Sequence, residues 1–275
     1  MVYGILRLIN FAHGDFYMVS AYISYTILGA VITGQQHNWA AVVGVGLVTM
    51  LAAGLLAVLA ERLIYRPMRK AALLSLMIAA LGLSLVLENG VLNIPAWGSA
   101  FRAYPITSPA DGFTVASTHY TWAQLIIVLV SGFLATGVWW LVNRTLMGKA
   151  MRAVSEDRVA ASLMGVNADW VIGVVFFIGG ALAGAAAVMA GVYYGQINYL
   201  QGFQVGLQAF TAAVLGGIGN VLGAVLGGVL LGIVESIGTG FVGPQWAVVF
   251  AFGALVIMLW LRPTGLLGER VARRV

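Results

Sequence analysis

The chain has 275 residues, of which 61% are hydrophobic and 8% are charged, with a formal net charge of +5 and no cysteine. Soluble domains carry roughly 25% charged residues, so this composition excludes a soluble protein and predicts a polytopic membrane protein. The absence of cysteine excludes disulfides and thiolate metal sites. At about 20 residues a span, the length fits about eight spans in one all-α transmembrane domain over residues 1–275.

The first eleven residues are typical of the end of an apolar segment that contains Arg7. They lack the charged region and long apolar run of a signal peptide. We therefore expect the chain to begin part-way through an element.

A polar cluster follows directly, in the run I-N-F-A-H-G-D-F-Y-M at 9–18. Polar groups at membrane depth usually face a cavity or a pathway, often at the end of a discontinuous helix. Asn10, His13, Gly14 and Asp15 are therefore candidates for a substrate pathway. The simpler alternative is an interfacial turn in which His13 and Asp15 meet water or headgroups and Asp15 is a helix N-cap.

Eight apolar segments are predicted to be helical. Segment 205–219 is short and glycine-rich, so it and its neighbour are also candidates for a re-entrant pair. In chain order the segments are about 16–33, 40–60, 71–92, 122–143, 170–192, 205–219, 221–238 and 245–261.

Basic residues occur in three connections that the predicted spans place on one side of the membrane. Four lie in each of 61–70, 144–168 and 262–275, whereas the opposite connections together contain only Arg102. The positive-inside rule assigns the three basic regions, and with them the C-terminus, to the cytoplasm. Nearly all the positive charge lies beside spans, which argues against a nucleic-acid partner. The external connection 93–121 is rich in turn formers and is either a partner surface or a plain connector.

The region at about 144–168 is the most polar part of the chain and predicts a cytoplasmic docking element. We expect a short helix at about 156–164, with Ser155 as its N-cap and Gly165 as its left-handed end. Val159 and Leu163 at i, i+4 spacing would give it an apolar side, and Glu156 would present charge.

Other motifs add less. Glycines at small-xxx-small spacing between 180 and 232 indicate close helix packing. The run L-G-G-I-G-N at 215–220 lacks the lysine and hydroxyl residue of a P-loop. Glu88 and Glu235, near the outer ends of predicted spans, are interface or pathway residues. No metal-binding pair or nucleophile motif is present, so we expect neither catalytic residues nor a metal site.

Two mechanisms of transport fit these observations. An ion-coupled secondary transporter or a channel also uses broken helices near the midplane, but few ionisable groups are available in the spans for coupling. A permease with a charged cytoplasmic surface and no nucleotide motif would instead receive energy from a separate ATPase.

Five motifs spread over almost the whole chain resemble the LivH family, the permease subunits of ABC importers for branched-chain amino acids, to which urea and short-chain amide permeases are similar. The family usually has a further apolar segment before the first motif. The motifs are M-V-Y-G-I-L-R-L-I-N-F-A-H-G-D-F-Y-M (1–18), E-R-L-I-Y-R-P-M-R (61–69), G-K-A-M-R-A-V-S-E-D-R-V-A-A-S-L-M-G-V-N (148–167), A-F-T-A-A-V-L-G-G-I-G-N (209–220) and R-P-T-G-L-L-G (262–268).

The resemblance implies an ABC importer permease fold in the bacterial inner membrane. It implies a complex with two cytoplasmic ATPases that hold ATP and Mg²⁺, a second permease subunit that is either a related chain or a second copy, and an external binding protein. This chain would bind no cofactor. The residues it assigns to ATPase coupling are Gly148, Arg152, Glu156, Asp157 and Gly165. Whether the substrate is a leucine-type amino acid, urea or an amide is not readable from these residues.

Overall fold

The computed structural model describes residues 10, 12–31, 39–69, 71–106, 112–115, 118–262 and 264–268. The expectation that the chain begins within an element, after a missing apolar segment, concerns residues outside this set. Within it, each of the eight predicted apolar segments is a helix, with ends that differ from the prediction by a few residues.

The eight apolar helices are α2 (His13–Val31), α3 (Trp39–Ala60), α4 (Leu73–Asn93), α5 (Trp122–Arg144), α8 (Ala168–Tyr194), α9 (Gln201–Gly216), α10 (Val221–Val242) and α11 (Ala247–Leu261). A π-helical turn (Glu61–Tyr65) continues α3, and a 3₁₀ turn (Pro244–Trp246) precedes α11. Two short helices, α6 (Leu146–Glu156) and α7 (Arg158–Leu163), lie between α5 and α8. These bounds confirm an all-α polytopic architecture.

Among the described residues, six helices are long and apolar enough to cross a membrane. The two others are α2, which carries polar groups at its start, and α9, whose 16 residues extend only about 24 Å against a hydrocarbon core of about 30 Å. The helices therefore follow the eight predicted segments, but α9 is too short to be a full span by itself.

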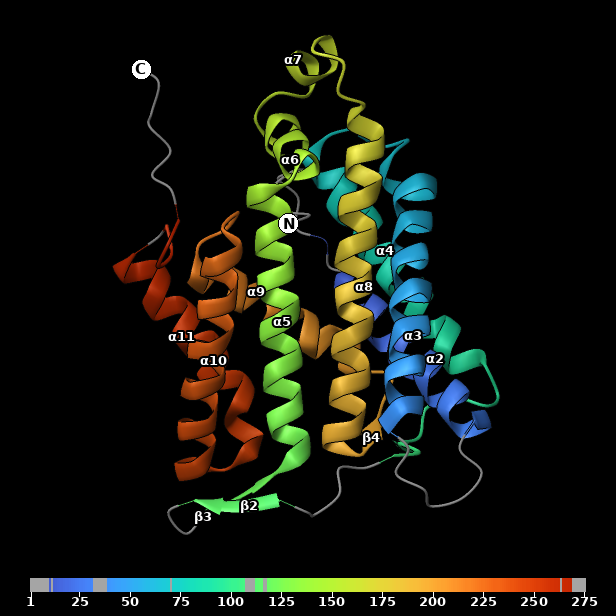
Figure 1. Ribbon diagram of the computed structural model, residues 1–275, viewed down its shortest axis with the longest axis vertical. Helices are drawn as coiled ribbons and strands as arrows, with labels where there is room; N and C mark the ends of the chain where they lie inside the picture. The colour runs from blue at the N-terminus through green and yellow to red at the C-terminus, as the bar shows by residue number, and fades with distance from the viewer. Residues whose placement is uncertain are drawn as a thin grey trace.

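Glycines set the closest helix crossings, as their spacing predicted. Gly180 and Gly184 of α8 leave room for the backbone of α3, where an added Cβ would meet the carbonyls of Ala53 and Thr49. Gly14 of α2 lies against the backbone of α9 in the same way. Such approaches supply van der Waals contact, which in lipid replaces the hydrophobic driving force between helices. The result is a core formed mainly by α2, α3 and α8 (Figure 1).

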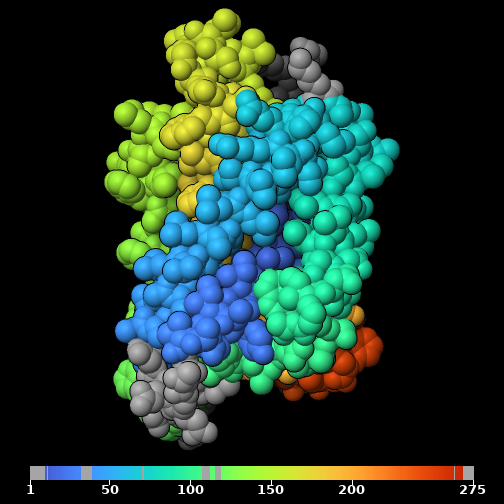
Figure 2. Space-filling view, turned by 90° about the vertical axis from the view of Figure 1, so that its right-hand side faces the viewer, coloured from blue at the N-terminus to red at the C-terminus, as the bar shows by residue number. Residues whose placement is uncertain are grey.

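The basic connections lie at one end of the bundle. The end of α3 and the α6–α7 pair lie at the top of Figure 1, and α11 ends lower at the left, far from the β2–β3 hairpin at the bottom. Figure 2 shows α7 projecting beyond the ends of the apolar helices. This arrangement agrees with the parity of the predicted spans.

The opposite end contains the connection 93–121, which forms short strands in its described parts. Strand β1 (Arg102–Ala103) pairs antiparallel with β4 (Gln196–Ile197), and β2 (Gly112–Val115) pairs with β3 (Thr118–Thr121). Beside β1, the Tyr104 hydroxyl donates a hydrogen bond to Ser24 Oγ at 2.8 Å. The connection is thus fastened to α2 and α8.

Candidate functional site

The polar region 144–168 folds as two helices rather than the single predicted helix at 156–164. Asp157 separates them: it ends α6 and caps α7, accepting hydrogen bonds from the backbone N–H groups of Val159 and Ala160 at 2.8 and 3.0 Å. The prediction that Ser155 is the N-cap is wrong, because Ser155 lies within α6 and donates to the Arg152 carbonyl. The Asp157 carboxylate, two residues later, is an equally good N-cap and caps α7 instead.

The α5–α6 corner fixes the direction in which this element leaves the membrane. Thr145 caps α6 by accepting from the Gly148 N–H at 3.1 Å. Gly148 is buried against the last turn of α5, where an added Cβ would collide with the carbonyls of Leu141 and Val142. Arg152 donates to the same Val142 carbonyl. Two of the predicted coupling residues, Gly148 and Arg152, therefore hold α6 onto α5.

Helix α7 presents an apolar surface to its surroundings. Val159, Leu163 and Met164 are 71, 83 and 84% exposed, while Ala161 is buried against the bundle side. Gly165 then takes a left-handed conformation with φ of +84°, as predicted, and turns the chain towards α8. An exposed aliphatic surface on a charged element outside the membrane is typical of a protein contact.

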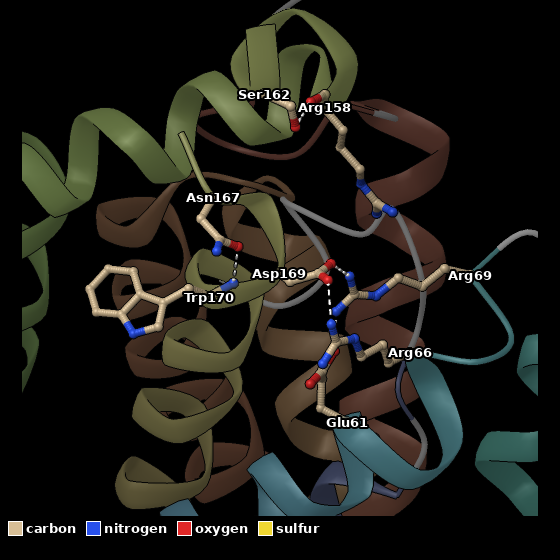
Figure 3. A network of polar contacts seen from close by, with 8 residues as sticks. All are labelled: Glu61, Arg66, Arg69, Arg158, Ser162, Asn167, Asp169 and Trp170. Carbon is tan, nitrogen blue, oxygen red and sulfur yellow. Dashed lines mark hydrogen bonds and ion pairs between the residues drawn. The ribbon is translucent and has the colours of Figure 1, made fainter. Parts of the chain in front are cut away.

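A network of charges joins the start of α8 to the end of α3 (Figure 3). Asp169, in the first turn of α8, accepts from Arg66 at 2.6 Å and from Arg69, and Arg69 also pairs with Glu61. The Glu61 and Arg69 side chains are only 3 and 15% exposed. Asn167 caps α8 two residues before Asp169. The chain that leaves α7 is therefore fixed within a few residues to the α3–α4 connection.

The five predicted coupling residues are not equivalent. Glu156 is exposed at the end of α6 and available to a partner. Asp157 and Gly165 shape α7, and Gly148 and Arg152 anchor α6. The structure brings all five into one element.

The predicted pathway residues also lie together, at the start of α2. Asn10 accepts from the Tyr65 hydroxyl at 2.7 Å, and His13 packs edge-on against Phe16 with ring centroids 6.0 Å apart. Asp15 is 2% exposed and lies inside the first turn of α2, so the alternative of an interfacial N-cap is wrong for this residue. Gly14 packs on α9.

Polar groups of α4 lie beside this region, and a second polar pair lies between α9 and α10. The Asp15 carboxyl faces Ser84 and Glu88 of α4. Within the described chain, Asp15 Oδ2 has no hydrogen-bond partner. Glu235 of α10 accepts from Gln208 of α9 at 3.1 Å. Both glutamates lie several residues inside their helices, which favours a role in the interior over one at the interface.

The glycines of 215–220 have a packing role. The backbone N–H groups of Leu266 and Leu267 donate to the carbonyls of Leu215 and Gly216 at 2.9 and 3.0 Å, so the turn after α11 docks on the end of α9. Gly217, with φ of +104°, has the backbone of Gly268 where a Cβ would be. The sequence motifs 209–220 and 262–268 are therefore in direct contact.

Sequence reasoning missed the acidic partners in the charge network, Glu61 and Asp169. The arginines of 61–70 were used for orientation only. A signal was available in the sequence. Acidic residues beside spans need cationic partners, and the connections 61–70 and 144–168 are predicted to lie on the same side of the membrane.

These features define a class: a multi-pass helical membrane protein with a polar helical extension at one end, which is the organisation of a transport permease. A model of the family described as branched-chain amino acid transport system / permease component matches residues 1–259. The chain belongs to this family and is a permease component.

Relatives that are similar along the whole chain include two permeases of known name. The high-affinity branched-chain amino acid permease LivH of Salmonella typhimurium is 37% identical over 281 residues, covering 100% of this chain and 90% of LivH. BraD of Pseudomonas aeruginosa is 38% identical over 284 residues, with 100 and 91% covered. The fructose import permease FrcC of Rhizobium meliloti is 28% identical over 55% of this chain. No solved structure matches.

Proposed function

We propose that this chain forms part of the path through which an ABC importer moves branched-chain amino acids into the cell, and that α7 is its contact with a separate ATPase subunit. The substrate class rests on the relatives that are similar over the whole chain. The exposed apolar surface of α7 is the observation that carries the docking assignment.

The proposed complex has two cytoplasmic ATPases, which hold ATP and Mg²⁺, a second permease subunit and an external binding protein. The basic end of the bundle, with α7 and the end of α11, faces the cytoplasm under the positive-inside rule. Closure of the ATPase pair would displace α7, and the short linkage through Gly165 and Asp169 would pass this displacement to α8 and α3 as a rigid-body movement.

The pathway would run past the start of α2, where Asp15, Ser84 and Glu88 lie together. An amino acid carries an ammonium group, and buried carboxylates with unused hydrogen-bonding capacity are groups that can receive it. Asn10, His13 and Gly14 would complete this section of the path.

A matched pair of variants tests docking. Leu163→Ser replaces an apolar side chain of α7 that is 83% exposed, and Leu146→Ser replaces one that is 81% exposed at the start of α6. Burial of a leucine contributes about 1.5–3 kcal/mol, so the ATPase should bind Leu163→Ser at least about tenfold more weakly. Leu146→Ser should leave its binding unchanged. The measurement is co-purification of the ATPase at equal permease levels.

Equal retention of the ATPase by both variants would contradict α7 docking. A purified chain that carries leucine into vesicles on an ion gradient, with no ATPase present, would instead support the secondary-transporter alternative.

A further inference from the structure

A groove of about 380 Å³ opens between the end of α3 and the start of α8, next to the charge network. Its upper rim is polar, with Arg62, Arg66 and Asp169, and its wall is apolar, with Val58, Val174 and Phe177. Gly173 leaves the wall open, since an added Cβ there would meet nothing within 4 Å. The groove therefore has a charged end and a hydrocarbon-like end.

The groove lies at the level of the lipid headgroups. The helical stretches 39–65 and 168–194 have 27 residues each, about 40 Å, against a hydrocarbon core of about 30 Å. Centred on the bilayer, each extends about three residues past either face. Arg62 and Trp170 then lie at the cytoplasmic boundary, the depth at which tryptophan and arginine anchor to headgroups.

The charge at the rim is not balanced within the described chain. Glu61 and Asp169 are held by Arg66 and Arg69. The Arg62 side chain is exposed and makes no hydrogen bond or ion pair in the described residues. Arg66 and Arg69 thus pair with the two carboxylates, while Arg62 and the nearby Arg158 leave an excess of positive charge at this end of the bundle.

We propose that this groove binds an anionic phospholipid of the cytoplasmic leaflet. Its phosphate would lie on Arg62 beside Arg66, with the glycerol region against Trp170 and an acyl chain along Val174 and Phe177. Basic pockets between membrane helices on the cytoplasmic side recognise anionic headgroups in this way. A lipid so bound would contact the arginine network that joins α8 to α3.

The test uses the purified full-length chain in detergent, with phosphatidylglycerol added and bound lipid counted by native mass spectrometry. Loss of one cation near a headgroup weakens binding by about fivefold, so Arg62→Gln should lower phosphatidylglycerol occupancy by that factor, and Arg62→Lys should retain most of it. Arg144→Gln is the matched control, because Arg144 is exposed at the same end of the bundle outside the groove.

Equal occupancy in the Arg62→Gln and Arg144→Gln variants would overturn the proposal, as would equal binding of phosphatidylcholine and phosphatidylglycerol. A photo-crosslinking residue at position 170 in native membranes gives an independent result. Capture of phospholipid supports the proposal, and capture of a protein subunit shows that the groove is a protein interface instead. Neither readout depends on ATPase docking or transport.

Discussion

Replacing Arg69 by glutamine should destabilise this permease far more than the same change at Arg66, although both arginines pair with Asp169. The difference lies in burial. Arg69 holds Glu61, whose side chain is 3% exposed, whereas the Arg66 and Asp169 side chains are 52 and 46% exposed. Removal of one partner from a buried pair costs about 3–5 kcal/mol, because the other charge is left without compensation. An exposed pair contributes about 0–1 kcal/mol.

The assay is unfolding in mixed micelles with increasing SDS, followed by tryptophan fluorescence, for Arg69→Gln, Arg66→Gln and the double variant Glu61→Gln/Arg69→Gln. The double variant should regain much of the loss, since no unpaired carboxylate remains. Equal losses for Arg69→Gln and Arg66→Gln, or a double variant less stable than Arg69→Gln, would refute the assignment of Glu61–Arg69 as the buried pair.

Three further outcomes follow from local geometry. Gly14→Ala should cost about 1–3 kcal/mol in the same unfolding assay, because its Cβ would meet the α9 backbone, while the control Gly44→Ala, with open space, should be near neutral. Gly165→Ala should cost about 1 kcal/mol, because φ is +84° there. Burial raises the pKa of Tyr104 to about 12. The neutral buried phenol therefore stabilises the fold fully below pH 10, and this stabilisation is lost as pH rises from 10 to 12 and the unfolded chain loses the proton first. Unfolding of Tyr104→Phe should lack that pH dependence.

The sequence was sufficient to predict the helices and the end of the bundle at which the polar region 144–168 lies. Hydropathy decides these features locally, since a span is an apolar run of fixed length and arginines mark one side. The polar cluster at 10–15 was also found, because charged groups are rare in such a chain. Burial of Asp15 excludes the interfacial N-cap for this residue, while its place in a substrate pathway stays a prediction.

Contacts between segments that are distant in the chain could not be predicted from the sequence. Glu61 and Asp169 are 108 positions apart and meet only through Arg69, and no local pattern relates them. The helix start at Asp157 was not predicted for a different reason. Serine and aspartate are nearly equal as N-caps, so propensity could not choose between Ser155 and Asp157. In the fold, the choice sets where α6 stops and which side chains α7 exposes.

Asp169 provides a test of whether docking and transport are separable. It lies two residues after the Asn167 cap of α8 and links that turn to both arginines, but it does not belong to the exposed surface of α7. Asp169→Asn should retain the fold, because Arg69 keeps its buried partner Glu61, and should retain the ATPase, because α7 is unchanged. Since couplings between sites are typically 1–3 kcal/mol, leucine uptake by the assembled complex should fall at least about fivefold, and Asp169→Glu should restore part of it. Normal uptake in Asp169→Asn would show that the movement of α7 reaches α3 by another route, through the packed glycines of α8.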